Sequence, residues 1–157
     1  MNTDPELNKT TKILFRVHSE LMDQDVEEII GAETIDLEMG KFRIQDIPFY
    51  TPNLATDDIV HAEYDSDEEM LIYRETLIPS GNSTVWVVVT DETIPIEEIQ
   101  EIFLELGCDS EEVSEHFFAM EIKATTNYFR ISDKLISLKS ESRIDYAESC
   151  LSIDHQY

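Results

Sequence analysis

The sequence predicts an α+β protein with a mainly antiparallel sheet in its N-terminal half and a ferredoxin-like split βαβ C-terminal half, about seven strands and two helices in all. Three observations support this class. Short runs of β-branched and aromatic residues alternate with turn residues in the first half. Two later segments carry apolar residues at helical spacing, and strand-like runs lie on both sides of each. The length of 157 residues suits one domain, which we expect at residues 12–157 after a flexible arm at 1–11.

In the first half, strand-favouring residues form several short runs. We expect these strands at residues 13–17, 34–39, 42–47, 59–64 and 70–78. The turn residues at 40–41 separate two of the runs and predict a hairpin. The acidic segment 20–32 is expected to form a short helical turn or a loop closed by Gly31. The polar residues 65–69 suit an exposed connection.

In the second half, Trp86 and four valines make residues 84–90 a near-continuous apolar run, typical of a central strand that is covered on both faces. A helix is expected at residues 94–106, ended by Gly107. Thr93 is its expected N-cap. The remaining elements are expected as a strand at 117–122, a second helix over 128–138 and a strand at 144–146.

The balance of charge is the unusual feature of the composition. Eleven Lys plus Arg stand against 35 Asp plus Glu, for a net charge of −24. Residues 123–157 carry equal numbers of bases and acids, so the whole surplus lies before them. It is concentrated in three stretches that contain no Lys or Arg, at residues 20–38, 57–69 and 91–115. Direct binding to DNA, RNA or an anionic membrane is disfavoured, because affinity for phosphate comes from Lys and Arg.

The third stretch contains a regular pattern. Glu97, Glu101 and Glu105 are spaced i, i+4, i+8 and form one stripe on the predicted helix, with Glu98 beside it. Like charges at this spacing cost about 0.2–0.5 kcal/mol per pair, so the stripe is mildly unfavourable for folding. A solvated face of an acidic protein explains one such helix taken alone. Three stretches without Lys or Arg, followed by a C-terminal segment with no net charge, favour an anionic surface that serves a function.

An anionic surface of this kind accelerates encounter with cationic proteins and discriminates against others. Inhibitors of nucleases use the same physics by placing carboxylates where phosphates would lie. We therefore predict a basic protein partner, such as a toxin of the nuclease class. The residues expected to bind it are Glu97, Glu98, Glu101, Glu105, Glu111, Glu112 and Glu115, with a second patch of Asp65, Asp67, Glu68 and Glu69. The candidate aromatic anchors are Tyr50, Tyr64, Phe117, Tyr128 and Tyr157.

Catalytic and metal-binding patterns are weak. The four histidines, His18, His61, His116 and His155, have no partner at a ligand spacing. The acidic run 65–69 begins like a calcium loop, but Met70 stands where the sharp turn needs glycine. The residues 80–84 lack the lysine and glycine spacing of a phosphate loop and suit a hairpin turn better. Cys108 and His116 stand eight residues apart on different predicted elements, so we interpret them as an accidental pair and not as a nucleophile and its base. We therefore expect no enzyme, cofactor or metal.

Two cysteines, Cys108 and Cys150, do not imply a disulfide framework in a chain of this length. The start of the chain lacks a basic segment followed by an apolar run, so no secretory signal is expected. The longest strongly apolar run, residues 85–89, is far shorter than the ~20 residues that cross a bilayer. From these features we expect a cytoplasmic protein.

Four short motifs follow one another along the chain: Ile47-Pro48-Phe49, Asp58-Ile59-Val60, Ser80-Gly81-Asn82-Ser83-Thr84-Val85 and Leu106-Gly107-Cys108. Their order and spacing resemble those of a family of bacterial proteins known as a domain of unknown function, over about residues 12–148. Where such members usually have Gly-Asp before two valines, this chain has Asp57-Asp58-Ile59-Val60. The resemblance implies no activity and no catalytic residues. Acidic single-domain proteins of this kind resemble the immunity proteins of toxin systems by analogy only.

Three functional hypotheses follow from these features. The first is a non-catalytic immunity or inhibitor protein that occludes the substrate groove of a basic toxin. The second is a small enzyme or ligand-binding domain with a pocket between sheet and helices, which a cavity lined by His61 or His116 with convergent carboxylates would favour. The third is a generic adaptor, or a protein whose acidity only reflects a salty cytoplasm.

Overall fold

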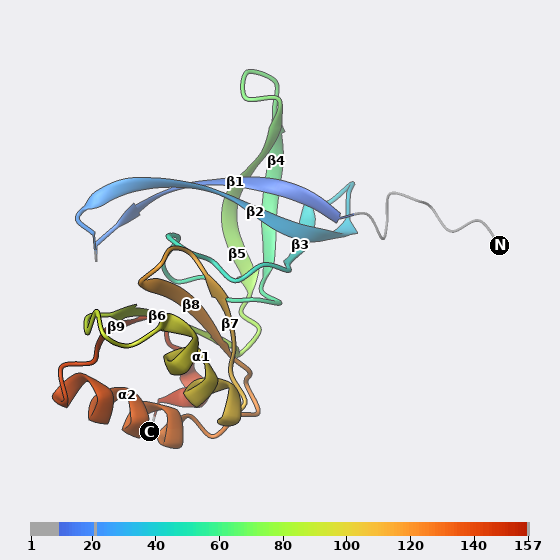
Figure 1. Cartoon of the computed structure of the whole chain (residues 1–157). Coiled ribbons are helices and arrows are strands. Elements are labelled where there is room, and N and C mark those ends of the chain that lie inside the picture. The colour runs from blue at the N-terminus through green and yellow to red at the C-terminus, as the bar shows by residue number, and fades with distance from the viewer. Residues whose placement is uncertain (1–9, 21, 157) are drawn as a thin grey trace. The chain divides into compact units, whose positions relative to one another are not determined.

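The computed structural model describes residues 10–20 and 22–156 of the chain. It divides into two compact units, Met1–Ser80 and Gly81–Tyr157, each with its own hydrophobic core (Figure 1). The single domain predicted for residues 12–157 stays a prediction. The predicted arm falls mostly on residues 1–9, which lie outside the described residues. Its end at residue 11 is wrong, because the first strand already begins at Thr10.

The first unit is a closed five-stranded barrel, in the order β1-β2-β3-β4-β5, rather than the simple antiparallel sheet that was predicted. Neighbouring strands are antiparallel, and a short parallel pairing of β1 with β5 closes the barrel. The strands are β1 Thr10–Ser19, β2 Gln24–Asp36, β3 Lys41–Ile44, β4 Ile59–Asp65 and β5 Met70–Ile78. The β5 bounds are those predicted from the sequence.

Alternate residues of these strands fill the barrel. Phe15, Ile30, Phe42 and Val60 are all fully buried there, or nearly so. The helical turn or loop predicted for residues 20–32 is wrong, because residues 24–32 of that segment belong to β2 and pair with β1. The inward positions of β2 include Val26, Ile30 and Ala32, while Asp25, Glu27 and Glu33 stand on the other face, as expected for a strand with one buried face.

The second unit is a four-stranded antiparallel sheet with two helices. Its elements are β6 Ser83–Val89, α1 Ile96–Glu105, β7 Asp109–Glu112, β8 Phe117–Ile122, α2 Tyr128–Ser140, β9 Ile144–Cys150 and the short 3-10 turn Ile153–His155. The sheet order is β7-β8-β6-β9. This βαββαβ succession with β6 and β8 in the centre is the ferredoxin-like arrangement expected for this half.

Both helices cover one face of this sheet (Figure 1). The core between them contains the alternate residues Val85, Val87 and Val89 of β6, together with Phe103 of α1 and Leu135 of α2. No helix among the described residues is long and apolar enough to cross a membrane.

Two local expectations for this unit are wrong. Strand β7 was not predicted, and the described residues form nine strands rather than about seven. The N-cap of α1 is Pro95, whose position makes no side-chain cap, and not Thr93. The Thr93 hydroxyl instead donates a hydrogen bond to the Asp91 carboxylate at 2.6 Å. Gly107 does end the helix, with a φ of 94° that favours glycine.

Candidate functional site

The predicted glutamate stripe lies on the solvent side of α1. Ile96, Ile99 and Phe103 turn into the core, and this fixes the opposite side of the helix toward solvent. Glu97, Glu98, Glu101 and Glu105 are all exposed. The helix therefore presents four carboxylates and, in its last turn, no basic side chain that would compensate them.

Strand β7 continues this acidic region. It follows α1 directly in the chain and lies beside it, and the Gln100 side-chain amide donates a 3.1 Å hydrogen bond to the Ser110 hydroxyl. Glu111, Glu112 and, after the strand ends, Glu115 are exposed. Asp109 is exposed as well, and sequence reasoning missed it. We call the set Glu97, Glu98, Glu101, Glu105, Asp109, Glu111, Glu112 and Glu115 the α1–β7 surface. It extends around the edge of the sheet, because Asp109 and Glu111 lie on the sheet face away from the helices, whereas the α1 glutamates lie on the helix side.

The carboxylates of the α1–β7 surface form no ion pair with any described residue. Three of the five bases of the second unit, Lys123, Lys139 and Arg143, pair with acids outside this surface. Lys123 contacts Glu121 at 3.2 Å, and Lys139 contacts Asp145 at 3.1 Å. Lys139 also lowers the pKa of Asp145, by a hydrogen bond to its carboxylate. The charge of the α1–β7 surface is thus not balanced from within the described chain.

The second predicted patch is the turn of the β4–β5 hairpin, in the first unit. The Asp65 carboxylate accepts hydrogen bonds from the backbone N–H groups of Asp67 and Glu68, at 2.8 and 3.2 Å, and so shapes the turn. Asp67, Glu68 and Glu69 are exposed, and Asp65 is half-buried. The two predicted patches therefore belong to different units.

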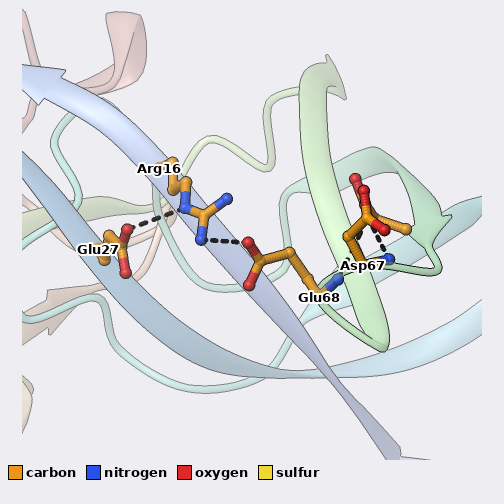
Figure 2. A network of polar contacts seen from close by, with 5 residues as sticks. Arg16, Glu27, Asp67 and Glu68 are labelled. Carbon is orange, nitrogen blue, oxygen red and sulfur yellow. Dashed lines mark hydrogen bonds and ion pairs between the residues drawn. The ribbon is translucent and has the colours of Figure 1, made fainter.

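Glu68 is already engaged by a base. Figure 2 shows the Arg16 guanidinium between two carboxylates, with Nε 2.9 Å from Glu27 and Nη2 2.7 Å from Glu68. Hydrogen bonds to Glu68 and then Glu27 raise the pKa of Arg16 above its ordinary value. Because the groups are exposed, this triad adds little to stability. It does remove Glu68 from the carboxylates that are free for a partner.

A pocket of about 270 Å³ opens on the β1–β2 hairpin in the same unit. It is lined by Arg16, Val17, His18, Asp25, Val26 and Glu27. The Nδ1 atom of His18 lies 3.0 Å from the Asp25 carboxylate. The pocket predicted between sheet and helices stays a prediction, and the β1–β2 pocket lies elsewhere, in the first unit. Neither His61 nor His116 lines the β1–β2 pocket.

The aromatic candidates differ strongly in exposure. Tyr64, at the end of β4 beside the acidic turn, has 65% of its side chain exposed, whereas Tyr128 is 3% exposed and belongs to the core. The Tyr128 hydroxyl donates to Glu148, and burial followed by this hydrogen bond raises its pKa. Tyr50 is 37% exposed, Phe117 is half-buried against Trp86, and Tyr157 lies outside the described residues.

In two of the sequence motifs, polar side chains hold backbone segments in place and do not form a reactive site. Asp58 is 3% exposed, and its carboxylate accepts from the N–H groups of Ala55 and Ser80 at 3.1 and 2.8 Å. Burial raises its pKa despite these bonds. Asp57 before it has a φ of 68°, in the left-handed region that favours glycine. The glycine that resembling sequences usually have at this position is thus explained by backbone conformation.

The Ser80–Val85 motif has a structural explanation too. It does not form the predicted hairpin turn, because β5 and β6 belong to different sheets. The Ser83 hydroxyl, fully buried, lies 2.6 Å from Nδ1 of His155 and accepts from the Ser152 N–H at 2.8 Å. Nε2 of His155 lies 3.1 Å from the Lys123 carbonyl. Both ring nitrogens of His155 thus lie within hydrogen-bond distance of other residues of the second unit, and both side chains are buried, which favours a structural role for this serine–histidine pair.

The other pair considered from the sequence is Cys108 with His116. Cys108 is 1% exposed, and burial raises the pKa of its thiol to about 12, which leaves almost no thiolate near neutral pH. His116, the base considered for it, is exposed at the start of β8. Among the described residues, no group of three or more His, Cys, Asp or Glu side chains is arranged to hold a metal ion.

Comparison with known proteins places the chain in a family. Residues 27–146 match the family model described as Domain of unknown function (DUF4265). The chain belongs to this family. The DUF4265 match covers the motifs from which the resemblance was inferred, and it includes the whole α1–β7 surface and the acidic hairpin turn.

One solved structure resembles the fold of this DUF4265 protein closely. It is described as a novel crystal structure of a hypothetical protein from Neisseria gonorrhoeae. The two chains share 26% sequence identity and superpose with a TM-score of 0.78, over 92% of this chain and 97% of the other. No match was found among curated proteins. These similarities establish the family and the fold of the chain, and neither description names an activity.

Proposed function

We propose that this protein is a non-catalytic immunity or inhibitor protein that binds a basic toxin of the nuclease class through the α1–β7 surface. The observation that carries the proposal is the unbalanced charge of that surface. Its eight carboxylates are exposed, come from adjacent elements, and have no cationic partner among the described residues.

The electrostatic repulsion within the glutamate stripe, which is unfavourable for folding, supports the proposal. Glu97, Glu101 and Glu105 repel one another along α1, and Glu105 also lies at the helix end that favours cations. A lysine at residue 101 would remove the repulsion of this position with Glu97 and with Glu105. It would not disturb the core, because Glu101 is exposed. A face that is unfavourable for folding and easily corrected is consistent with a role in binding.

The mechanism follows from electrostatics. A nuclease binds phosphates in a groove lined by Lys and Arg, and a rigid array of carboxylates presents comparable charge to that groove. Long-range attraction raises the rate of encounter, and the seated inhibitor excludes the nucleic acid. The inhibitor needs no chemical step. The acidic hairpin turn with exposed Tyr64 is a second contact region in this proposal, with Asp65, Asp67 and Glu69 as its remaining carboxylates.

The experiment uses a basic protein recovered on the full-length chain from native lysate at low salt. If the recovered protein is a nuclease, a stoichiometric amount of this chain should abolish its activity. The variant with Glu97→Lys, Glu101→Lys and Glu105→Lys should fail to do so. Full inhibition by this variant, or recovery only of proteins that are not basic, would refute the proposal.

The control is a second triple reversal with the same change in net charge, Glu38→Lys, Glu75→Lys and Asp133→Lys. These three residues are exposed and form no ion pair with a described residue. The control variant should inhibit nearly as well as the unaltered chain. Equal loss in both variants would indicate that only the overall charge matters and that the α1–β7 surface is not the site.

The alternative, a ligand-binding domain, is favoured by one observation, the pocket on the β1–β2 hairpin with its His18–Asp25 pair. A small ligand bound there would stabilise the folded state and raise the melting temperature in a metabolite screen. Such stabilisation, lost on His18→Ala, would favour this function over inhibition.

A further inference from the structure

Strand β7 is an edge strand with one open side. It pairs with β8 from Asp109↔Glu121 to Glu112↔Phe118 and has no second strand partner among the described residues. An open edge presents unpaired N–H and C=O groups that can accept a further strand. Many edges are blocked by proline or a bulge, but β7 contains no proline and its register with β8 is regular.

The open backbone groups can be assigned to particular residues. The Val113 N–H donates to the Phe117 carbonyl at 2.8 Å, which continues the β7–β8 ladder by one hydrogen-bonded pair. In an antiparallel ladder such pairs alternate with pairs whose backbone groups point away from the partner. Glu111 therefore bonds to β8, and the N–H and C=O groups of Ser110 and Glu112 point to the open side. The Cys108 N–H fits this alternation, because it bonds to the Phe103 carbonyl of α1 instead of β8.

The side chains of β7 decide what can pair there. Three of its four residues are acidic. A second copy of this strand would place carboxylates opposite carboxylates, which is destabilising. A strand rich in Lys or Arg would place opposite charges across the new pairing. Asp109 and Glu111 lie on the sheet face away from the helices, since Ser110 and Glu112 pair with the core residues Met120 and Phe118.

We propose that a cationic, extended segment of the partner protein adds to the β7 edge as a fifth strand of the sheet. This inference rests on the proposed function and gives its binding mode. The N–H and C=O groups of Ser110 and Glu112 hydrogen-bond to the added strand, and its Lys or Arg side chains on one face meet Asp109 and Glu111. The backbone bonds fix the register, and the carboxylates select a basic sequence.

The test uses a short synthetic peptide that alternates lysine and valine, with capped ends, and the full-length protein. Binding should slow amide hydrogen exchange at Ser110 and Glu112 more than at the residues of α1. A matched peptide with every second amide N-methylated has the same charge but cannot form the ladder. It should bind at least about tenfold more weakly, because several backbone hydrogen bonds are lost together.

A pair of variants separates backbone from side chain. Ser110→Pro removes the outward N–H without removing a bond to β8, while Ser110→Ala removes only the hydroxyl that Gln100 contacts. The proline variant should bind the peptide about three- to tenfold more weakly, and the alanine variant as well as the unaltered chain. If the proline variant does not fold, the comparison of the two peptides on the unaltered protein decides alone.

Failure of strand addition can be distinguished from failure of the proposed function. Equal binding of both peptides, or protection only at α1, would overturn strand addition while leaving the α1–β7 surface as an electrostatic site. Loss of binding in the Glu97→Lys, Glu101→Lys, Glu105→Lys variant would then still support the proposed function. Association of the protein with itself through β7, seen as a dimer in sedimentation that Ser110→Pro dissolves, would also refute the assignment to a cationic partner.

Discussion

Glu28 is a carboxylate whose position is fixed by the loop that it holds. It accepts hydrogen bonds from the N–H groups of Phe49, Tyr50 and Thr51 at 2.7, 3.0 and 2.9 Å, and from the Thr51 hydroxyl at 2.8 Å. Glu28 thus ties the irregular segment after the Ile47-Pro48-Phe49 motif to the barrel. In a chain with so many acids, this is one whose charge has a structural use.

We predict that Glu28→Ala lowers the free energy of unfolding by about 2–4 kcal/mol, because the substitution leaves several N–H donors without their charged acceptor. The measurement is urea unfolding, read as a shift in midpoint with an unchanged m value. Glu38→Ala is the control, since Glu38 is exposed and its side chain forms no hydrogen bond or ion pair with a described residue. This substitution should change the free energy of unfolding by no more than about 0.5 kcal/mol. Equal effects of the two substitutions would contradict this role of Glu28.

At the scale of elements, α1 should become more stable when its charge pattern is corrected. Glu101→Lys converts two repulsive i, i+4 contacts, with Glu97 and Glu105, into attractive ones. We predict an increase of about 0.5–1 kcal/mol in the free energy of unfolding at low salt, together with weaker binding of the partner.

Salt provides the control for this prediction. The gain should shrink at high ionic strength, because exposed charges are then screened. The exposed acid Glu75, on β5, offers a matched substitution, and Glu75→Lys should change stability less, since no glutamate stripe surrounds it. A Glu101→Lys protein that is less stable at low salt would show that the stripe is held by interactions that this account omits.

The elements that the sequence predicted well are those with strong local signals. Strand β5 was found with its bounds, and both helices were found because apolar residues recur on one face of each. Strand β7 was missed, because Asp109-Ser110-Glu111-Glu112 has no local preference for a strand and is held by its pairing with β8. Strand β2 was missed since Glu28 interrupts the inner-face series of Val26, Ile30 and Ala32, and acids also stand on the outer face.

The candidate residues could be placed from the sequence only in part. Exposure of the α1 glutamates follows from the helical period, and the structure has them on the solvent side as expected. The contact of β7 with α1, which adds Asp109 to the surface, depends on tertiary pairing that no local pattern reveals. The same is true of Arg16, which neutralises Glu68 from a strand 52 residues away in the chain.

At the scale of the whole molecule, closure of the first unit was beyond sequence reasoning. The parallel contact that makes a barrel joins Ile13 to Leu71 and Leu14 to Ile72, and such long-range pairing has no sequence signature. The distribution of charge was accessible, because it requires only counting. The net charge of −24 lies before residue 123, and residues 123–157 carry equal numbers of bases and acids, two pairs of which are in contact, Lys139 with Asp145 and Arg143 with Glu141.

The central claim is that the α1–β7 surface steers a basic protein to this chain. Its most direct test is the association rate constant with the basic partner, measured over a series of salt concentrations for three proteins. These are the unaltered chain, the Glu97→Lys, Glu101→Lys, Glu105→Lys variant, and the Glu38→Lys, Glu75→Lys, Asp133→Lys control. We predict that the first variant alone associates about 10–10³-fold more slowly at low salt and loses most of the salt dependence. Equal rates and equal salt dependence in the two variants would contradict the claim.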